Sequence, residues 1–254
     1  MKSTTPKIVI VGGGAGGLEL ATQLGHKLGK RNKAQILLID KNRHHIWKPL
    51  LHEVATGSLD SDIDGVVYSA HAAKHGYQFQ LGTFSALDVH NKSLTLAPQL
   101  DENGQQILPW REVSYDKLVI AVGSVSNDFN TPGIKDFCYF LDSHQQAKRF
   151  HHALLDNFTR IHQADNNKSL HIAIVGAGAT GVELSAELYH VADLLKVYGL
   201  SNMTGKKLNI HLIEAGSSIL PALPPRISTA VRRELSKLGV NVMENTRIAR
   251  AGEE

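Results

Sequence analysis

The sequence predicts an α/β fold, because an apolar run, a glycine-rich turn and the start of a helix follow one another twice along the chain. In the first copy, residues 8–11 read Ile-Val-Ile-Val and lead directly into six small residues, Gly12-Gly13-Gly14-Ala15-Gly16-Gly17. A helical pattern then starts at Leu18. This order is typical of a buried strand that turns sharply into a helix.

The spacing Gly12-x-Gly14-x-x-Gly17 has a mechanical basis. The first glycine permits the tight turn, the second lets a pyrophosphate approach the backbone, and the third lets the helix pack closely on the strand. The N-terminus of the helix then offers free N–H groups and the positive end of its dipole to the phosphates. A second strand, residues 35–39, leads into Asp40, where this fold needs an acceptor for ribose hydroxyls.

The same device occurs again at residues 171–188, with the spacing Gly176-x-Gly178-x-x-Gly181. Its matching strand, residues 208–213, leads into Glu214, and residues 197–207 form a polar loop before it. One such glycine pattern is weak evidence, but two, each followed by a strand and an acid, predict two Rossmann-like dinucleotide-binding domains.

Composition is ordinary for a globular protein of one large domain or two medium ones, with 254 residues, 42% of them hydrophobic and 20% charged. A net charge of +3 without a dense Lys/Arg run gives no reason to expect a nucleic-acid partner. The single cysteine, Cys138, excludes an internal disulfide framework and a redox cysteine pair. We see no signal peptide or transmembrane run and expect a cytoplasmic location.

Histidines are frequent, but their spacing predicts no metal site. His71 and His75 stand four residues apart without a companion carboxylate motif. We therefore interpret the 14 histidines mainly as surface and packing residues.

The remaining pattern predicts the other elements in chain order. We expect helices at residues 15–28, 62–76, 143–162 (capped by Ser143) and 226–238 (ended by Gly239), and a buried strand at 118–122 that ends at Gly123. Short strands at 78–81, 85–90, 93–97 and 105–108 predict an inserted β-meander. A linker at 127–142, a turn at 165–168 and a strand at 240–243 complete the prediction.

Residues 41–60 have no clean period, and two interpretations compete. One is a loop followed by a short helix that packs on the sheet. The other is a segment that passes over the planar ring of a ligand, with Pro49 fixing its backbone. The residues alone favour the first, because proline and mixed aromatic residues mark many loops.

Two nucleotide units in one chain suggest that one dinucleotide reduces another, and FAD with NADH is the common pair. The first unit would hold FAD and the second NADH. Glu214 would accept from the adenosine ribose 2′-OH and repel a 2′-phosphate, and no Arg or Lys occurs in residues 215–219. We therefore expect NAD rather than NADP.

The order GGGAGG, YDKLVIAVGS and GAGATGVELSAEL resembles the two-dinucleotide-binding-domain flavoproteins. Within them, WKPLLHEVATGSLD is similar to a segment of the type II NADH:quinone dehydrogenases, which pass electrons from NADH through FAD to a membrane quinone without pumping protons. The resemblance covers residues 7 to about 250. It implies an FAD-binding domain over residues 1–130, with the NADH-binding domain, 131–254, nested in it.

The resemblance also implies the residues of both sites. Those expected to contact FAD are Gly12, Gly14, Ala15, Gly16, Gly17, Asp40, Lys41, Pro49, Leu50, Ala121 and Gly123. Those expected to contact NADH are Gly176, Gly178, Thr180, Gly181 and Glu214.

Glu183 matches a family glutamate close to the contact between nicotinamide and flavin. The resemblance makes it a catalytic candidate. The competing interpretation is a solvated residue in the first turns of a helix, where the dipole favours a negative charge.

Members of this family are longer, so we interpret the chain as C-terminally truncated. The family continues with a segment that returns to the flavin, quinone-contacting residues and amphipathic helices that hold the protein on the membrane, at the cytoplasmic face of the inner membrane. We expect this chain to lack that anchor and to retain FAD weakly or not at all. Whether it forms a homodimer stays open.

Two alternatives remain. A ferredoxin- or rubredoxin-type reductase shares both glycine patterns and would use an iron–sulfur partner instead of quinone. A non-catalytic NAD(H)-binding protein would bind NADH without electron transfer. Disulfide reductases and sulfide:quinone oxidoreductases need a cysteine pair, which one cysteine does not supply.

Overall fold

The computed structural model describes residues 5–59, 65–101, 103–163, 169–197 and 207–253. The chain divides into two compact units, which we call unit 1 (Met1–Lys48 and Asp62–Ser124) and unit 2 (Pro49–Ser61 and Val125–Glu254). The division differs from the predicted boundary after residue 130, since it falls after Ser124 and since residues 49–61 group with unit 2. The assignment of one dinucleotide to each unit stays a prediction.

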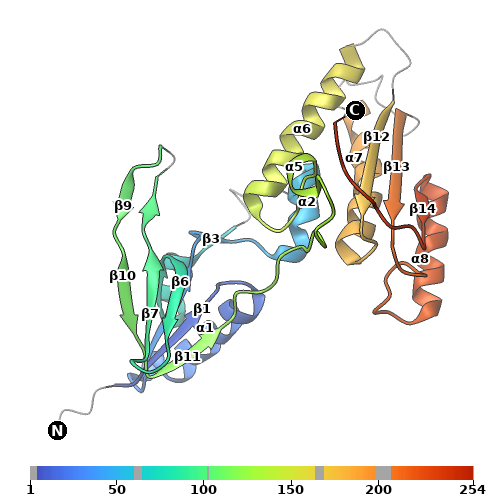
Figure 1. The fold of residues 1–254 in the computed structure, drawn as a ribbon. Helices are drawn as coiled ribbons and strands as arrows, with labels where there is room; N and C mark the ends of the chain where they lie inside the picture. The colour runs from blue at the N-terminus through green and yellow to red at the C-terminus, as the bar shows by residue number, and fades with distance from the viewer. Residues whose placement is uncertain (1–4, 60–64, 102, 164–168, 198–206, 254) are drawn as a thin grey trace. The chain divides into compact units, whose positions relative to one another are not determined.

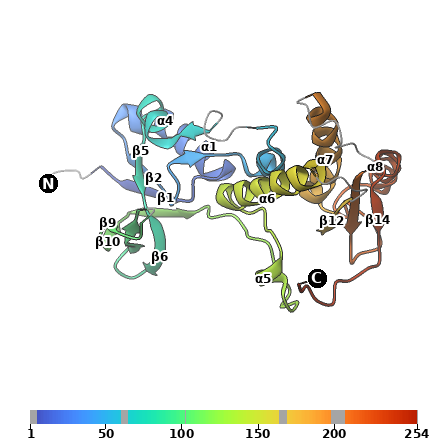
Figure 2. The ribbon, with the colours of Figure 1, turned by 90° about the horizontal axis from the view of Figure 1, so that it is seen from above.

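Unit 1 is built on a parallel four-stranded sheet in the order β11-β1-β2-β5. Strands β1 and β11 are labelled in Figure 1, and β1, β2 and β5 in Figure 2. The strands are β1 (Lys7–Val11), β2 (Gln35–Asp40), β5 (Gln78–Leu81) and β11 (Lys117–Ile120). Helix α1 (Ala15–Lys27) joins β1 to β2, and helix α4 (Tyr68–His75) precedes β5. Shorter elements of unit 1 are η1 (Gly29–Arg31), β3 (His44–His45) and β4 (Val66–Val67), and η2 (Lys48–Leu50) spans the boundary at which the chain passes to unit 2.

The two faces of this sheet are covered differently, which gives unit 1 three layers (Figure 2). Alternate strand residues such as Ile10 and Leu38 pack with Ala21 of α1 and Ala72 of α4. The other face packs Val9, Val11, Leu37 and Ile39 against Leu94, Leu96 and Val113 of an antiparallel sheet. Successive side chains of a strand point to opposite faces, and both faces of this sheet are covered. Nearly every residue of β1 and β2 is therefore apolar.

The antiparallel sheet confirms the predicted meander but not all of its strands. It comprises β6 (Thr83–Asp88), β7 (Ser93–Ala97) and β10 (Arg111–Ser114), with a hairpin of β8 (Gln99–Leu100) and β9 (Gln106–Leu108). Residues 78–81 were expected in the meander, and this was wrong. They form β5, which pairs in parallel with β2 because α4 carries the chain back across the sheet.

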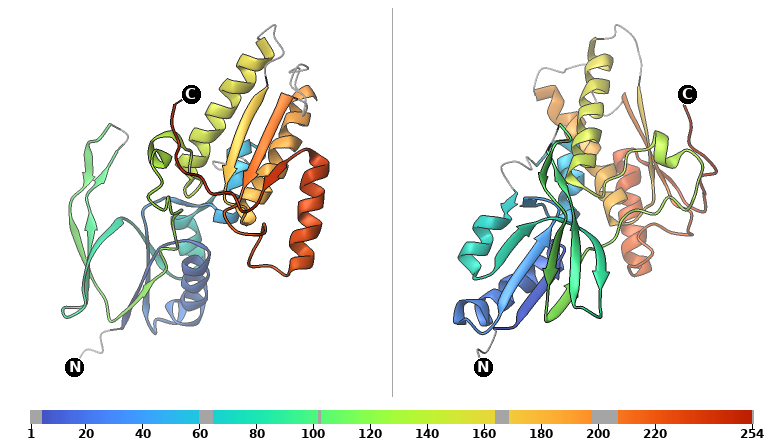
Figure 3. Two further views of the ribbon diagram at one scale, coloured as in Figure 1. Left: turned by 45° about the vertical axis from the view of Figure 1, so that its right-hand side comes forward. Right: turned by 60° about the vertical axis from the view of Figure 1, so that its left-hand side comes forward.

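Unit 2 contains the second parallel sheet, in the order β12-β13-β14 (Figure 3). Its strands are β12 (Leu170–Val175), β13 (Leu208–Ile213) and β14 (Asn241–Met243), and its helices are α5 (Ile134–Phe137), α6 (His144–Gln163), α7 (Ala179–Val197) and α8 (Pro225–Leu238). The predicted ends of two helices are confirmed: the Ser143 hydroxyl accepts from Gln146 N at 3.3 Å, and Gly239 ends α8 at φ 101°. The expected turn at 165–168 and most of the polar loop at 197–207 lie outside the described residues.

The short helix expected within residues 41–60 exists, as α2 (Leu51–Thr56), but its expected packing on the sheet was wrong. It lies against α6 and α7 of unit 2. Leu51, Val54 and Ala55 are buried, so its apolar face is used on helices rather than on strands. This packing explains why residues 49–61 group with unit 2.

One contact of α2 predicts a loss of stability in acid. His151 of α6 lies beneath Gly57, where an added Cβ would stand 2.3 Å from the His151 Cε1, and the His151 Nδ1 is buried without a hydrogen-bond partner. Burial lowers the pKa of His151. Below a pH of about 6.5 the unfolded chain therefore binds the proton more readily than the folded chain, and stability falls as the pH falls.

We expect the unfolding temperature to decrease from pH 7.5 to pH 5.5, and His151→Gln to remove part of that decrease. Burial lowers the pKa of His45 in unit 1 too, so the decrease is not expected to vanish. The control is His90→Gln at an exposed position. An equal pH dependence in the original chain and in His151→Gln would contradict the expectation.

Within the part of the chain that the structure describes, no helix is long and apolar enough to cross a membrane.

Candidate functional site

The first glycine loop connects the end of β1 to the start of α1, and its glycines are required by their neighbours. Gly12 has φ +102°, and an added Cβ would lie 2.3 Å from the Ala121 carbonyl oxygen. A Cβ on Gly17 would lie 1.8 Å from the Gly12 carbonyl oxygen. These two glycines therefore permit the turn and the close packing of helix on strand, as the spacing predicts.

Gly14 and Gly16 have a different environment, because an added Cβ at either position would meet nothing within 4 Å. Gly14 is the N-cap of α1, and no side chain caps this helix end. The first backbone bond of the helix runs from Leu18 N to Gly14 O at 2.9 Å. The amides of the first turn thus have no acceptor in the helix, and the space beside Gly14 and Gly16 is open, which is the arrangement that binds anions.

Asp40, at the end of β2, is joined to this loop. Its Oδ2 accepts from Gly13 N at 2.7 Å, and its Oδ1 accepts from Asn42 N at 2.8 Å. The carboxylate therefore stands beside the glycine loop, where the sequence predicts a ribose acceptor.

The loop between β12 and α7 repeats this bonding plan. Gly176 has φ +101°, a Cβ on Gly181 would lie 2.1 Å from the Gly176 carbonyl oxygen, and a Cβ on Gly178 would meet nothing within 4 Å. Gly176 N donates to Ile213 O at 2.8 Å, just as Gly12 N donates to Ile39 O at 2.8 Å.

The acid of the second loop is also in the equivalent place. Glu214 Oε2 accepts from Ala177 N at 2.9 Å, as Asp40 accepts from Gly13 N. Its Oε1 accepts from Gly216 N at 2.7 Å. Thr180 lies in the first turn of α7, next to Gly181.

The structure brings together most of the residues expected at the FAD site, but not all. Ala121 N donates to Val11 O at 2.7 Å, so the end of β11 lies beside the first glycine loop. Gly123 is exposed and has φ +70°, and Lys41 is exposed. Pro49 and Leu50 group with unit 2, so unit 1 alone does not place them near the loop.

Glu183, on α7, has a half-exposed side chain, and its Oε2 lies 3.5 Å from the Nδ1 of the nearly buried His52. His52 Nδ1 is also 2.8 Å from Pro49 O. One turn further along α7, Glu187 accepts a hydrogen bond from Ser58. The segment after α2 thus contacts the same helix face that carries Glu183, within unit 2.

Sequence reasoning missed two residues of the first loop, Tyr68 and His45. Both hydrogen-bond the Gly13 carbonyl, from α4 and β3. His45 is an exception to the interpretation of the histidines as mainly surface and packing residues. A histidine five residues after the strand-end acid was the available signal, while nothing in the expected helix at 62–76 distinguished Tyr68.

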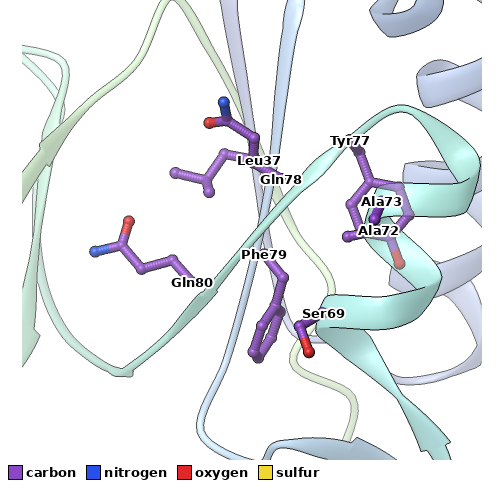
Figure 4. Close-up of a pocket in the computed structure, with 8 residues that line it drawn as sticks. All are labelled: Leu37, Ser69, Ala72, Ala73, Tyr77, Gln78, Phe79 and Gln80. Atoms are coloured by element: carbon purple, nitrogen blue, oxygen red, sulfur yellow. The ribbon is translucent and has the colours of Figure 1, made fainter.

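A shallow hollow of about 440 Å³ lies along β5 and α4 (Figure 4). Its lining residues are Leu37, Ser69, Ala72, Ala73, Tyr77, Gln78, Phe79 and Gln80. None of them is an expected site residue, and none is an acid or base that suits catalysis near neutral pH. Among the described residues, no group of three or more His, Cys, Asp or Glu side chains could hold a metal ion.

Two strand–glycine loop–helix units, each with a strand-end carboxylate on its loop, define a protein with two dinucleotide-binding sites. The model of the pyridine nucleotide-disulphide oxidoreductase family matches residues 6–254, and the chain belongs to this family of oxidoreductases.

Named relatives are more specific. The chain is 47% identical to the type II NADH:quinone oxidoreductase of Haemophilus influenzae, over 96% of this chain and 58% of that protein. It is 26% identical to the type II NADH:quinone oxidoreductase NdhA of Mycobacterium tuberculosis, over 95% of this chain and 50% of that protein. The chain therefore spans about half of the length of the curated relatives it matches.

Solved structures agree on the fold. The structure of NDH2 from Plasmodium falciparum in complex with NADH has a TM-score of 0.81 at 23% identity, covering 98% of this chain and 50% of that one. A ferredoxin reductase from Rhodopseudomonas palustris has a TM-score of 0.69 at 17% identity, covering 98% of this chain and 52% of that one. The predicted α/β fold with two dinucleotide-binding units is confirmed.

Proposed function

We propose that the protein is an FAD-dependent oxidoreductase that takes hydride from NADH and passes the electrons to a membrane quinone. The observation that carries the proposal is the bonding plan built twice: a glycine loop with free helix amides, and a strand-end carboxylate bonded to that loop. Two such sites fit two dinucleotides, and the relative at 47% identity is a type II NADH:quinone oxidoreductase.

Each loop fits the pyrophosphate of a dinucleotide. A Cβ added at Gly14 or Gly178 would meet nothing within 4 Å, so a phosphate can reach the backbone there. Asp40 and Glu214 would accept from the ribose hydroxyls. FAD, when bound, supplies the hydride acceptor and releases electrons singly or in pairs.

The same proposal assigns the remaining expected residues. Ala121 and Gly123 would contact FAD from the end of β11, Lys41 from the end of β2, and Pro49 with Leu50 would lie near its isoalloxazine ring. Glu183 would stand at the contact between nicotinamide and flavin. Glu214 would select NADH over NADPH, since its charge opposes a 2′-phosphate.

The location and assembly are proposals as well. We propose that the whole protein acts at the cytoplasmic face of the inner membrane as a peripheral protein, because its acceptor is a membrane quinone. A homodimer is the assembly to test by sedimentation of the purified chain.

The test is an absorbance spectrum of the purified chain with added FAD under anaerobic conditions, before and after NADH. With FAD added at a concentration that overcomes the weak retention expected of this chain, we expect flavin bands that NADH bleaches, followed by reoxidation with a short-chain quinone. Reoxidation by a ferredoxin or rubredoxin, and not by quinone, would favour the reductase alternative. NADH binding without bleaching, in the presence of bound flavin, would contradict hydride transfer.

A further inference from the structure

Gly13 is the one residue of the first loop whose peptide groups are held on both sides by side chains. Its N–H donates to Asp40, as described above. Its carbonyl accepts from the Tyr68 hydroxyl at 2.6 Å and from His45 Nδ1 at 2.9 Å. The three side chains come from β2, α4 and β3, so three separate segments of unit 1 converge on one residue.

Tyr68 is fixed before it reaches the loop. It is the first residue of α4, its N–H donates to Arg43 O at 3.1 Å, and its side chain is 2% exposed. Its ring stacks on Phe79 with centroids 4.9 Å apart. Burial raises the pKa of Tyr68 far above its usual range, so the hydroxyl stays protonated and donates a hydrogen bond to the Gly13 carbonyl.

The direction of the Gly13 carbonyl determines the direction of the next amide. The chain has no cis peptide bond, and in a trans peptide the C=O and the N–H point in opposite directions. A Gly13 carbonyl turned toward Tyr68 and His45 therefore turns the Gly14 N–H away from them. Gly14 is the N-cap position of α1, where the surroundings are open.

The second loop holds the equivalent peptide by other means. Ala177 occupies the place of Gly13: its N–H donates to Glu214, and its carbonyl accepts from the backbone N–H of Leu220 at 2.8 Å. This difference also explains why position 13 is glycine. A Cβ there would lie 2.3 Å from the Tyr68 hydroxyl oxygen, whereas Ala177 has no such side chain on its carbonyl.

We propose that Tyr68, assisted by His45, is a positioning residue that sets the first loop for the FAD pyrophosphate before the cofactor binds. The inference rests on the proposed function in that it takes FAD as the ligand of unit 1. It adds that the carbonyl of the equivalent peptide is held by side chains in one loop and by a backbone N–H in the other. Removing one hydroxyl should then affect one dinucleotide and not the other.

The test compares Tyr68→Phe with Tyr77→Phe in the full chain. Tyr77 is a matched control, because its ring is also buried in unit 1 and its hydroxyl bonds His71 Nδ1 at 2.9 Å rather than the loop. With His45 still on the carbonyl, we expect Tyr68→Phe to raise the Kd for added FAD about three- to tenfold, the range of one hydrogen bond. The Kd for NADH should be unchanged in both variants.

A second readout needs no cofactor. Amide hydrogen exchange of residues 12–17 in the ligand-free chain should be faster in Tyr68→Phe than in Tyr77→Phe. Equal exchange in the two variants, or equal weakening of FAD and NADH binding by Tyr68→Phe, would overturn the proposal. If the unchanged chain binds NADH but no added FAD, the proposed function of unit 1 fails, and the exchange rates still decide whether Tyr68 holds the loop.

Discussion

Alanine at Gly17 should destabilise unit 1 by about 3 kcal/mol, the upper end of the usual cost of overpacking. The added Cβ would lie 1.8 Å from the Gly12 carbonyl oxygen and 3.2 Å from the Ala121 Cβ. Neither neighbour is the end of a flexible side chain, so α1 must move away from β1. The separation would also shift the amides that face the phosphate site, and we expect FAD binding to be lost.

Gly16→Ala is the matched control, since it adds the same methyl group one residue earlier. Its Cβ would meet nothing within 4 Å, and the position lies in the first turn of α1. Alanine is favoured over glycine within a helix by about 0.5–1 kcal/mol, so stability should be unchanged or slightly higher.

The measurement is the unfolding temperature of the purified variants. For a chain of this size, the expected loss in Gly17→Ala corresponds to about 6–12 °C. Gly181→Ala should repeat the effect in unit 2, where the Cβ would lie 2.1 Å from the Gly176 carbonyl oxygen. Similar unfolding temperatures for Gly16→Ala and Gly17→Ala would show that the close packing is not required.

The parts of the fold that were predictable are those fixed by local sequence. Strands β5, β7 and β13 match the expected bounds, because their alternating or continuous apolar residues end at a glycine, a proline and an acid, respectively. Residues 78–81 form the predicted strand, and the error concerned only the strand with which it pairs. The sequence of a four-residue strand does not specify whether the strand pairs with one that precedes it or one that follows it in the chain.

The site shows the same limit. The glycines and the strand-end acids were predictable, because each has a steric or hydrogen-bonding reason that lies within one strand–loop–helix unit. Tyr68 was not, since its role arises only where α4 meets Gly13, 55 residues earlier in the chain. His45 stands five residues after Asp40, and this signal was not used. The packing of α2 on α6 and α7 was missed for the same reason as Tyr68: an apolar helix face does not specify what covers it.

The second large effect is expected from substitution of the two strand-end acids, because each substitution should weaken the binding of a different dinucleotide. Asp40→Asn should raise the Kd for FAD about 10- to 100-fold and leave NADH binding unchanged, and Glu214→Gln should do the reverse. Each carboxylate accepts a hydrogen bond from a loop N–H with one oxygen and from a second backbone N–H with the other. Hydrogen bonds to a charged group contribute about 1.5–3 kcal/mol, which sets the size of the expected change.

Titrations of both variants with FAD, NADH and NADPH measure the Kd of each variant for each dinucleotide. Glu214→Gln should also narrow the preference for NADH over NADPH, because it removes the charge that opposes a 2′-phosphate. The control is Glu234→Gln, an exposed carboxylate on α8 whose partner is Lys237 at 2.9 Å, which should change no Kd. If Asp40→Asn weakened NADH binding as strongly as FAD binding, the assignment of one dinucleotide to each loop would be wrong.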